Sequence, residues 1–374
     1  MERIQCVICS GKQFTPAINL LNTINIVSIN KFNSSEIKEL FFIGCLNCGC
    51  IQLRNLFLQN EIYSQPLQIF DGPAIQKHHE LFCDFIIKNI NYEEVLFEIG
   101  GSYGNLAKRI ITHYKNRNID ITYKILEYSA EHYPKIENIE YISGDCEVYS
   151  YNNIKTIIMS HVFEHLYNPR DFLKKISNTD IHNIFISIPD MDSLSKIGDI
   201  NNLNCLHTFY INSKYIIYLF QLAGFHLKDI YEYKNNSIFY YFVKNDQYKQ
   251  IENIEYKQTN LLTEIPNFYK KMTNVVEQIN INQPFYICPS GFYGQFIYFY
   301  LNKETKKNAI GFLDGDKYKI DKRLSGTELT IYEKKHIMNC ENIIVLISSV
   351  KHQTEIINEL LNYNNKIKYI NAFQ

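Results

Sequence analysis

The chain has 374 residues, more than one ordinary hydrophobic core accommodates, so we expect two or three domains. Lys and Arg together number 38 and Asp and Glu 39, which gives a net charge of -1. This balance argues against a broad basic surface for nucleic acid or an anionic membrane, and it favours a small-molecule substrate. Because the sequence has no secretion signal and no apolar run of membrane-spanning length, we expect a cytoplasmic protein.

Residues 1–72 have short apolar runs, no long helical period and two C-x-x-C pairs. The four paired cysteines are Cys6, Cys9, Cys45 and Cys48. Two such pairs can surround one tetrahedral ion, and zinc suits a set of four thiolates. The sequence therefore predicts an N-terminal zinc-binding module. Two points stay open: the alternative of scattered buried cysteines, and the part played by Cys50, a fifth nearby thiol.

Residues 73–247 open with a helical stretch at 73–89 and then alternate apolar runs with amphipathic ones. The runs that we expect to be strands are residues 95–97, 123–126, 154–159 and 184–188. The helices expected between and after them start at Gly104 and Pro169 and span residues 215–223. This alternation predicts an α/β domain with a parallel sheet covered by helices on both faces. Residues 228–233 and 238–243 read as an antiparallel hairpin at its edge.

A polar stretch at 245–258 reads as a linker, and the strand–helix alternation resumes within residues 260–374. Expected strands there are residues 285–288, 309–313 and 343–347, with one helix starting at Gln295 and another closing the chain. We therefore expect a third, smaller α/β domain of Rossmann-like type.

The first strand of the middle domain ends in an acidic residue and a glycine-rich turn. The residues of this segment are Glu98, Gly100, Gly101, Ser102 and Gly104. Glycine tolerates positive φ and lets the backbone approach a ligand closely. By itself such a turn is equally compatible with a purely structural role.

Acidic residues also follow the next two strands. Glu127 lies about twenty residues downstream of the turn, where an acid accepts hydrogen bonds from ribose hydroxyls. Asp145 follows another short strand and suits the adenine amino group, although a helix-capping role is the plainer reading for that residue alone. Together, the turn and the two acids predict a nucleotide-like cofactor.

The middle domain resembles class I methyltransferases that use S-adenosylmethionine (SAM). The run SHVFEHL at 160–166, followed by Asn168 and Pro169, is similar to the motif after that family's fourth strand, and ISIPD at 186–190 to its fifth strand. The resemblance implies that Glu98 and residues 100–104 border the methionine and ribose parts of SAM. It further implies the following neighbours of the cofactor: Glu127 at the ribose, Asp145 and Cys146 at the adenine, His161 at the methionine part, and Tyr128 as a further cofactor-binding residue. Glu164 and His165 would be structural.

The whole chain resembles the sugar C-methyltransferase family that acts on nucleotide-linked deoxysugars. The four-cysteine module followed by GCIQL at 49–53 carries this resemblance, and so do three C-terminal segments. These are PSGFYGQ at 289–295, GFLDGD at 311–316 and LSGT at 324–327. The resemblance implies a structural zinc, a SAM domain and a C-terminal domain that contacts substrate.

His207 falls where that family carries its catalytic histidine, and a histidine can accept a proton near neutral pH. A structural role is the plain alternative for a single histidine. The sequence also departs from the family here, because Asn204, Cys205 and Leu206 replace its tyrosine and His-Glu-His cluster. O- or N-methylation therefore stands beside C-methylation as an expectation.

The first hypothesis is a SAM-dependent methyltransferase acting on a nucleotide-linked or glycan-bound sugar. A second is an NAD-linked sugar-modifying enzyme that uses residues 291–294 and Asp314 of the C-terminal domain, although the turn lacks the full G-x-G-x-x-G pattern. A third is a non-catalytic zinc-ribbon interaction protein on a degenerate methyltransferase fold.

Overall fold

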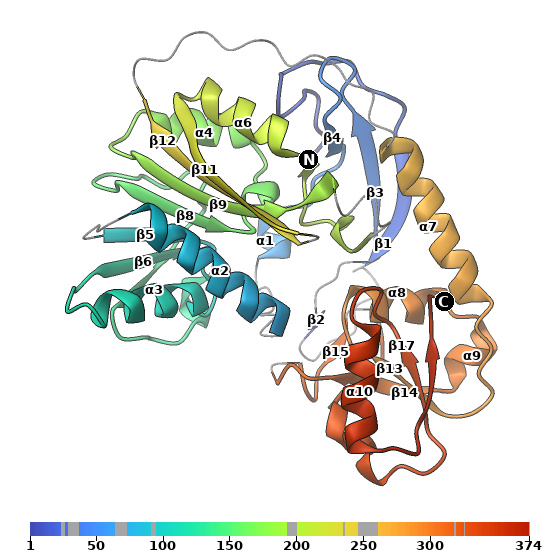
Figure 1. Cartoon of the computed structure of the whole chain (residues 1–374). Coiled ribbons are helices and arrows are strands. Elements are labelled where there is room, and N and C mark those ends of the chain that lie inside the picture. The colour runs from blue at the N-terminus through green and yellow to red at the C-terminus, as the bar shows by residue number, and fades with distance from the viewer. Residues whose placement is uncertain are drawn as a thin grey trace.

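The computed structural model describes most of the chain, and its elements are shown in Figure 1. The described residues are 1–23, 27–28, 37–63, 73–90, 95–192, 200–234, 236–245, 261–317, 319–324 and 326–373. Most of the linker expected at 245–258, and Ser325 of the LSGT segment, lie outside them.

The largest sheet has seven strands in the order β11-β12-β9-β8-β5-β6-β7. Their bounds are β5 (Val95–Ile99), β6 (Thr122–Glu127), β7 (Ile139–Ser143), β8 (Thr156–Ser160), β9 (Asn183–Pro189), β11 (Phe225–Tyr233) and β12 (Ser237–Lys244). Strands β5 to β9 run parallel, whereas β12 is antiparallel to both β9 and β11. The expected hairpin is therefore present at the sheet edge. This arrangement is the Rossmann-like class I methyltransferase fold predicted from the sequence.

The strand order reverses at β5, whose neighbours are β6 on one side and β8 on the other. In open α/β sheets the two connections leave such a strand pair in opposite directions and open a crevice at its carboxyl ends. The fold thus places a candidate ligand site where β5 and β8 end.

Helices cover both faces of this sheet (Figure 1). They are α2 (Pro73–Asn89) and α3 (Asn105–Lys115) on one face and α4 (Pro169–Ser177) and α6 (Ser213–Leu222) on the other. Side chains of β8 alternate between the two cores: Ile157 and Met159 pack on the α4 side and Ile158 on the α2 side. Short 3-10 turns lie between these elements, namely η2 (Ala130–His132), η3 (Phe163–His165) and η4 (Ile200–Asn202). Burial on both faces explains why the parallel strands read as continuous apolar runs.

The N-terminal sheet has four strands in the order β1-β3-β4-β10. Their bounds are β1 (Ile18–Thr23), β3 (Ile37–Gly44), β4 (Ile51–Leu53) and β10 (Phe209–Tyr210), and α1 (Gln59–Ile62) follows β4. Strand β10 comes from the middle of the chain and pairs antiparallel with β4. The segment just after His207 therefore completes the N-terminal sheet.

The C-terminal sheet has five parallel strands in the order β16-β14-β13-β17-β18. The elements of this part are α7 (Leu261–Glu277), β13 (Phe285–Cys288), α8 (Phe292–Tyr300), α9 (Lys303–Lys307), β14 (Ala309–Asp314), β16 (Ile331–Glu333), η5 (Lys334–Asn339), β17 (Ile344–Ile347), α10 (Gln353–Tyr363) and β18 (Lys368–Asn371). A small ribbon joins β15 (Arg323–Leu324) to β2 (Val27–Ser28) of the N-terminal part. Helix α8 starts three residues before the expected Gln295, and α7 packs beside β1 and β3 (Figure 1). The domain boundaries proposed from the sequence stay predictions, because these contacts cross them.

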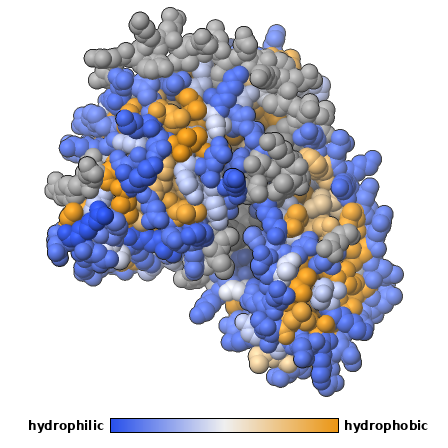
Figure 2. Space-filling view, in the orientation of Figure 1, coloured by the Kyte–Doolittle hydropathy of each residue, from blue (hydrophilic) through white to orange (hydrophobic). Residues whose placement is uncertain are grey.

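Hydrophilic side chains dominate the face shown in Figure 2, and the apolar residues on it form separate patches. Among the described residues, no helix combines the length and the apolar character that a bilayer crossing needs.

Arg3 ties the N-terminal segment to the middle domain. Its guanidinium is buried and donates to the carbonyl oxygens of Thr208 and Tyr167, the latter at 2.9 Å, and to the Thr208 hydroxyl at 2.9 Å. Burial lowers the pKa of Arg3 to about 10, so the group stays charged at neutral pH. One side chain thus satisfies carbonyl groups near His207 that water does not reach.

Replacing Arg3→Met should lower the free energy of unfolding by about 1–3 kcal/mol, because buried carbonyl groups lose their donor. Denaturant unfolding followed by circular dichroism measures this change. Arg54→Met is the matched control, because Arg54 forms an exposed ion pair with Glu2 at 2.7 Å. Its loss should cost less than about 1 kcal/mol. Equal effects of the two substitutions would contradict the role given to Arg3.

Candidate functional site

The glycine-rich turn connects β5 to α3 at the crevice. Gly100, Ser102 and Gly104 all have positive φ, at 71°, 50° and 67°. A Cβ on Gly100 would lie 2.5 Å from a methyl group of Val162, and one on Gly101 would lie 2.8 Å from Glu98 Oε2. Larger residues therefore do not fit without moving their neighbours. The turn keeps its backbone close to both Glu98 and the segment after β8.

Glu127 reaches from the end of β6 to this turn. The Ser102 backbone N–H donates a hydrogen bond to Glu127 Oε1 at 2.5 Å, and Tyr141 donates from its hydroxyl to the Ser102 carbonyl at 2.9 Å. Burial raises the pKa of the Glu127 carboxyl to about 7. The acid and the turn that the sequence paired are thus in direct contact.

Glu98 lies beneath the same turn and is 1% exposed. Its carboxyl accepts a hydrogen bond from the Tyr123 hydroxyl at 3.0 Å. Burial first and the charge of Glu127 second raise the pKa of Glu98 to about 8. Lys124, on the neighbouring strand, pairs with Glu140 instead. In the described part of the chain, the buried carboxyl of Glu98 and the half-buried carboxyl of Glu127 thus lie at one edge of the sheet, and no Lys or Arg forms an ion pair with either.

The other residues predicted at the ribose and adenine have partners within the protein. Tyr128 is partly exposed and its ring lies 5.6 Å from that of Tyr63. Asp145 Oδ1 accepts a hydrogen bond from the backbone N–H of Glu147 at 2.8 Å, as an acid that caps a turn does. The Gly144 N–H donates to the Glu127 carbonyl at 2.9 Å, which brings this turn to the same edge. Cys146 follows Asp145, with its thiol largely buried.

His161 follows β8 and has a positive φ of 54°. Its ring contacts the Glu164 carboxylate through Nδ1 at 3.2 Å and the Ser237 hydroxyl through Nε2 at 3.0 Å. The His78 ring lies 4.8 Å away, tilted by 46° to the His161 ring, and its Nε2 forms a hydrogen bond with the Ser187 hydroxyl. His161 therefore lies at the end of β8, beside the glycine turn, within a network of histidines and hydroxyls.

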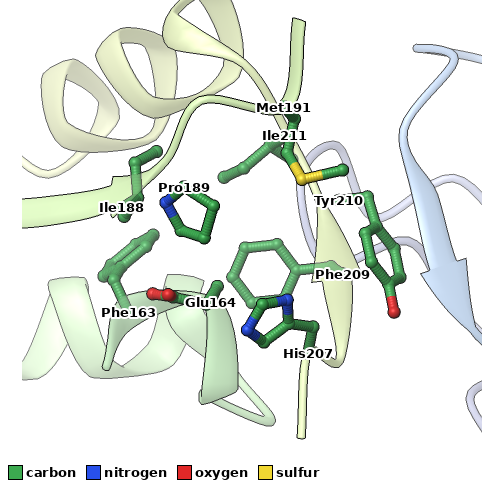
Figure 3. A pocket seen from close by; sticks show the side chains of 9 residues that line it. All are labelled: Phe163, Glu164, Ile188, Pro189, Met191, His207, Phe209, Tyr210 and Ile211. Carbon is green, nitrogen blue, oxygen red and sulfur yellow. The ribbon is translucent and has the colours of Figure 1, made fainter. Parts of the chain in front are cut away.

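His207 lines a small pocket between the end of β9 and strand β10 (Figure 3). The pocket is lined by Phe163, Glu164, Ile188, Pro189, Met191, His207, Phe209, Tyr210 and Ile211. In Figure 3 the Glu164 carboxylate and the His207 ring lie on one side of the pocket, and Met191 and Ile211 lie across from them. Burial lowers the pKa of His207 to about 3, with the nearby His165 as the next cause. The imidazole is therefore neutral at pH 7 and faces a mostly apolar space.

Sequence reasoning missed several contributors to this region. Tyr123 supplies the hydroxyl that bonds Glu98, and Ser237 supplies the partner of His161. Tyr123 lies inside an apolar strand and Ser237 opens a strand far along the chain, so neither carries a local signal.

The four cysteines predicted to bind zinc lie together. Cys6 Sγ is 3.6 Å from Cys48 Sγ, and Cys9 Sγ is 3.6 Å from Cys45 Sγ. Sulfurs held around zinc by bonds of 2.3 Å lie about 3.8 Å apart in a tetrahedron. Backbone N–H groups of residues 8, 11 and 47 point to three of these sulfurs at 3.4 Å. The cluster thus fits a closed four-thiolate site of the structural type.

Cys50 is buried beside this cluster but is not one of the four grouped thiols. Its Sγ donates to the Ile51 carbonyl at 3.5 Å. None of the ten cysteines forms a disulfide.

No protein-family model matches the sequence, and no curated protein matches it. Among solved structures, the chain is similar to a complex of the Haloferax volcanii Trm112 methyltransferase activator with a methyltransferase, with a TM-score of 0.39, 9% identity, and coverage of 47% of this chain and 94% of that chain. Human N-acetylserotonin methyltransferase in complex with SAM matches with a TM-score of 0.38 and 15% identity over 46% of this chain and 54% of that chain. The mitomycin 7-O-methyltransferase MmcR matches with a TM-score of 0.38 and 11% identity over 46% and 55%. This chain therefore spans about half the length of the latter two. Because these TM-scores are low, the fold assignment rests on the strand order.

Replacing Cys9→Ser together with Cys48→Ser should lower the zinc content and the stability of the purified protein together, because metal binding contributes to folding. Elemental analysis and thermal unfolding measure the two quantities. Cys340→Ser is the control, since Cys340 lies in the C-terminal part, outside the four-cysteine group, and its Sγ donates a hydrogen bond to the His336 carbonyl. A wild-type protein without zinc would discard the zinc assignment.

Proposed function

We propose that the protein is a SAM-dependent methyltransferase that acts on a sugar, either nucleotide-linked or part of a glycan. One observation carries the proposal: two carboxyls, the buried Glu98 and the half-buried Glu127, flank a glycine-rich turn where the strand order reverses. SAM carries a positively charged sulfonium, an amino group and ribose hydroxyls, and all of these can interact with the two carboxyls.

The electrostatics support a cationic ligand. Ionising a buried carboxyl without a cation is unfavourable, and this raises the pKa of both groups. A bound sulfonium and amino group would stabilise the ionised forms. In this proposal Glu127 binds the ribose, residues 100–104 border the methionine and ribose, and Asp145 with Cys146 borders the adenine.

The acceptor would enter from the side of the His207 pocket. This pocket lies between the end of β9 and β10, and the cofactor-facing turn at His161 contacts its Glu164 wall. Methyl transfer depends mainly on holding the acceptor in line with the sulfonium. His207, which the sequence analysis identified, is the candidate proton acceptor. The proposal includes methylation of a carbon, an oxygen or a nitrogen atom of the acceptor. The sugar specificity rests on the family resemblance.

The NAD-linked alternative receives no comparable support from the C-terminal domain. Asp314 already accepts hydrogen bonds from the Ser290 N–H and hydroxyl, and it pairs with Lys319 at 3.0 Å. A Cβ on Gly294 would lie 2.5 Å from the Pro289 carbonyl, so this glycine is needed for packing. Fluorescence titration with NADH distinguishes an NAD-linked enzyme from a SAM-dependent one. Absence of SAM binding would favour the third hypothesis, a non-catalytic zinc-ribbon interaction protein.

Replacing Glu127→Ala should weaken SAM binding by about 1–3 kcal/mol, because ribose hydroxyls lose a charged partner. Isothermal titration with SAM measures the loss. Glu140→Ala is the control, since Glu140 lies on the neighbouring strand but is exposed and paired to Lys124. Unchanged affinity in the Glu127 variant would remove this residue from the site.

SAM affinity should rise with pH between about 6 and 8. The free protein holds protons on Glu127 and Glu98 up to pKa values of about 7 and about 8, and a cationic ligand must displace them. Each displaced proton changes the affinity by up to about tenfold per pH unit. Titration at pH 7 in buffers of different ionisation enthalpy should therefore detect proton release. An affinity independent of pH would contradict the electrostatic argument.

A further inference from the structure

A second cluster of metal-ligating side chains lies apart from the cysteines. Glu164 and His165 belong to η3, and His207 precedes β10. One ligand atom from each of the three residues lies within 4.8 Å of the others. Two imidazoles and one carboxylate form the ligand set of many zinc and non-haem iron sites.

One oxygen of this cluster lacks a partner. Glu164 is 5% exposed, and its Oε2 is buried without a hydrogen-bond partner among the described residues. Leaving a buried carboxylate oxygen unsatisfied is costly, and native structures rarely do so without a water, an ion or a ligand. This oxygen is therefore an independent sign that a group is missing from the site.

A neighbouring histidine fixes the orientation of one of the three side chains, Glu164. His161 Nδ1 contacts Glu164 Oε1 at 3.2 Å, which leaves Oε2 for another partner. Metal-binding histidines and carboxylates are commonly held by such outer contacts.

We propose that Glu164, His165 and His207 bind one divalent cation of the zinc, iron or manganese group. Three protein ligands leave a fourth position open, and the pocket of Figure 3 lies beside Glu164 and His207. An oxygen ligand, from water or from an acceptor hydroxyl, would occupy that position. Ligand atoms around zinc lie about 3.4 Å apart, so atoms that lie within 4.8 Å of one another need to approach by at most about 1.4 Å on binding.

Metal ligation would use the lone pair that His207 needs to accept a proton. The two roles for His207 therefore exclude each other. The metal proposal does not depend on the identity of the methyl donor, because it rests on the ligand set and on the unpaired Glu164 oxygen.

The test is a cobalt titration of the full-length protein purified with zinc in its cysteine module. The wild type should bind one further equivalent of Co(II), with visible d–d absorption and without the near-ultraviolet charge-transfer band of thiolate ligands. Glu164→Gln and His207→Ala should each abolish this second equivalent, while zinc content and circular dichroism stay unchanged. His132→Ala is the control, since His132 lies on η2 and pairs with Glu131.

A wild-type protein that binds no second equivalent overturns the proposal, and this result needs no variant to fold. Undiminished cobalt binding in both variants overturns it as well, because the ion then lies elsewhere. A charge-transfer band accompanying the second equivalent would assign the ion to thiolates and also count against the proposal.

Discussion

The hydrogen bond between the Ser102 N–H and the Glu127 carboxylate joins the ends of two adjacent parallel strands. It forms because Ser102 adopts positive φ within a turn whose glycines admit no side chain. The bond holds the carboxylate half-buried, and this burial raises its pKa to about 7. Every argument for a cationic cofactor depends on this constraint, since an exposed Glu127 would ionise freely and carry no preference for charge.

Much of the fold was predictable, because strands buried on both faces read as apolar runs and their helices follow the amphipathic period. Strands β1, β3 and β4 of the N-terminal part were not predicted, and neither were three short strands, β10, β16 and β18. The last three were the hardest to predict. Each has two to four residues, too few to show a period, and β10 forms only because β4 is there to pair with it. Pairing between segments far apart in the sequence leaves no local pattern.

The candidate sites divide in the same way. In the cysteine pairs and in the acid–glycine turn, the functional residues lie close together in the sequence. They could therefore be predicted from the sequence alone. The histidine cluster did not stand out, because Glu164 and His165 were assigned a structural role and His207 lies about forty residues further along the chain. Its geometry arises from the approach of η3 to the segment before β10. The missing partner of Glu164 is a property of packing, and no sequence pattern encodes it.

The pairing of β10 with β4 and the hydrogen bonds of Arg3 join the N-terminal part closely to the middle domain. Tyr215 of α6 adds to this by donating to the Cys48 carbonyl at 2.6 Å. A shortened chain beginning near residue 73 would therefore expose an unpaired strand edge directly after His207 and leave buried carbonyls open to solvent. The middle domain is therefore not a portable unit, because grafting it alone would remove the strand that pairs with β10 and the buried donor to the Thr208 carbonyl.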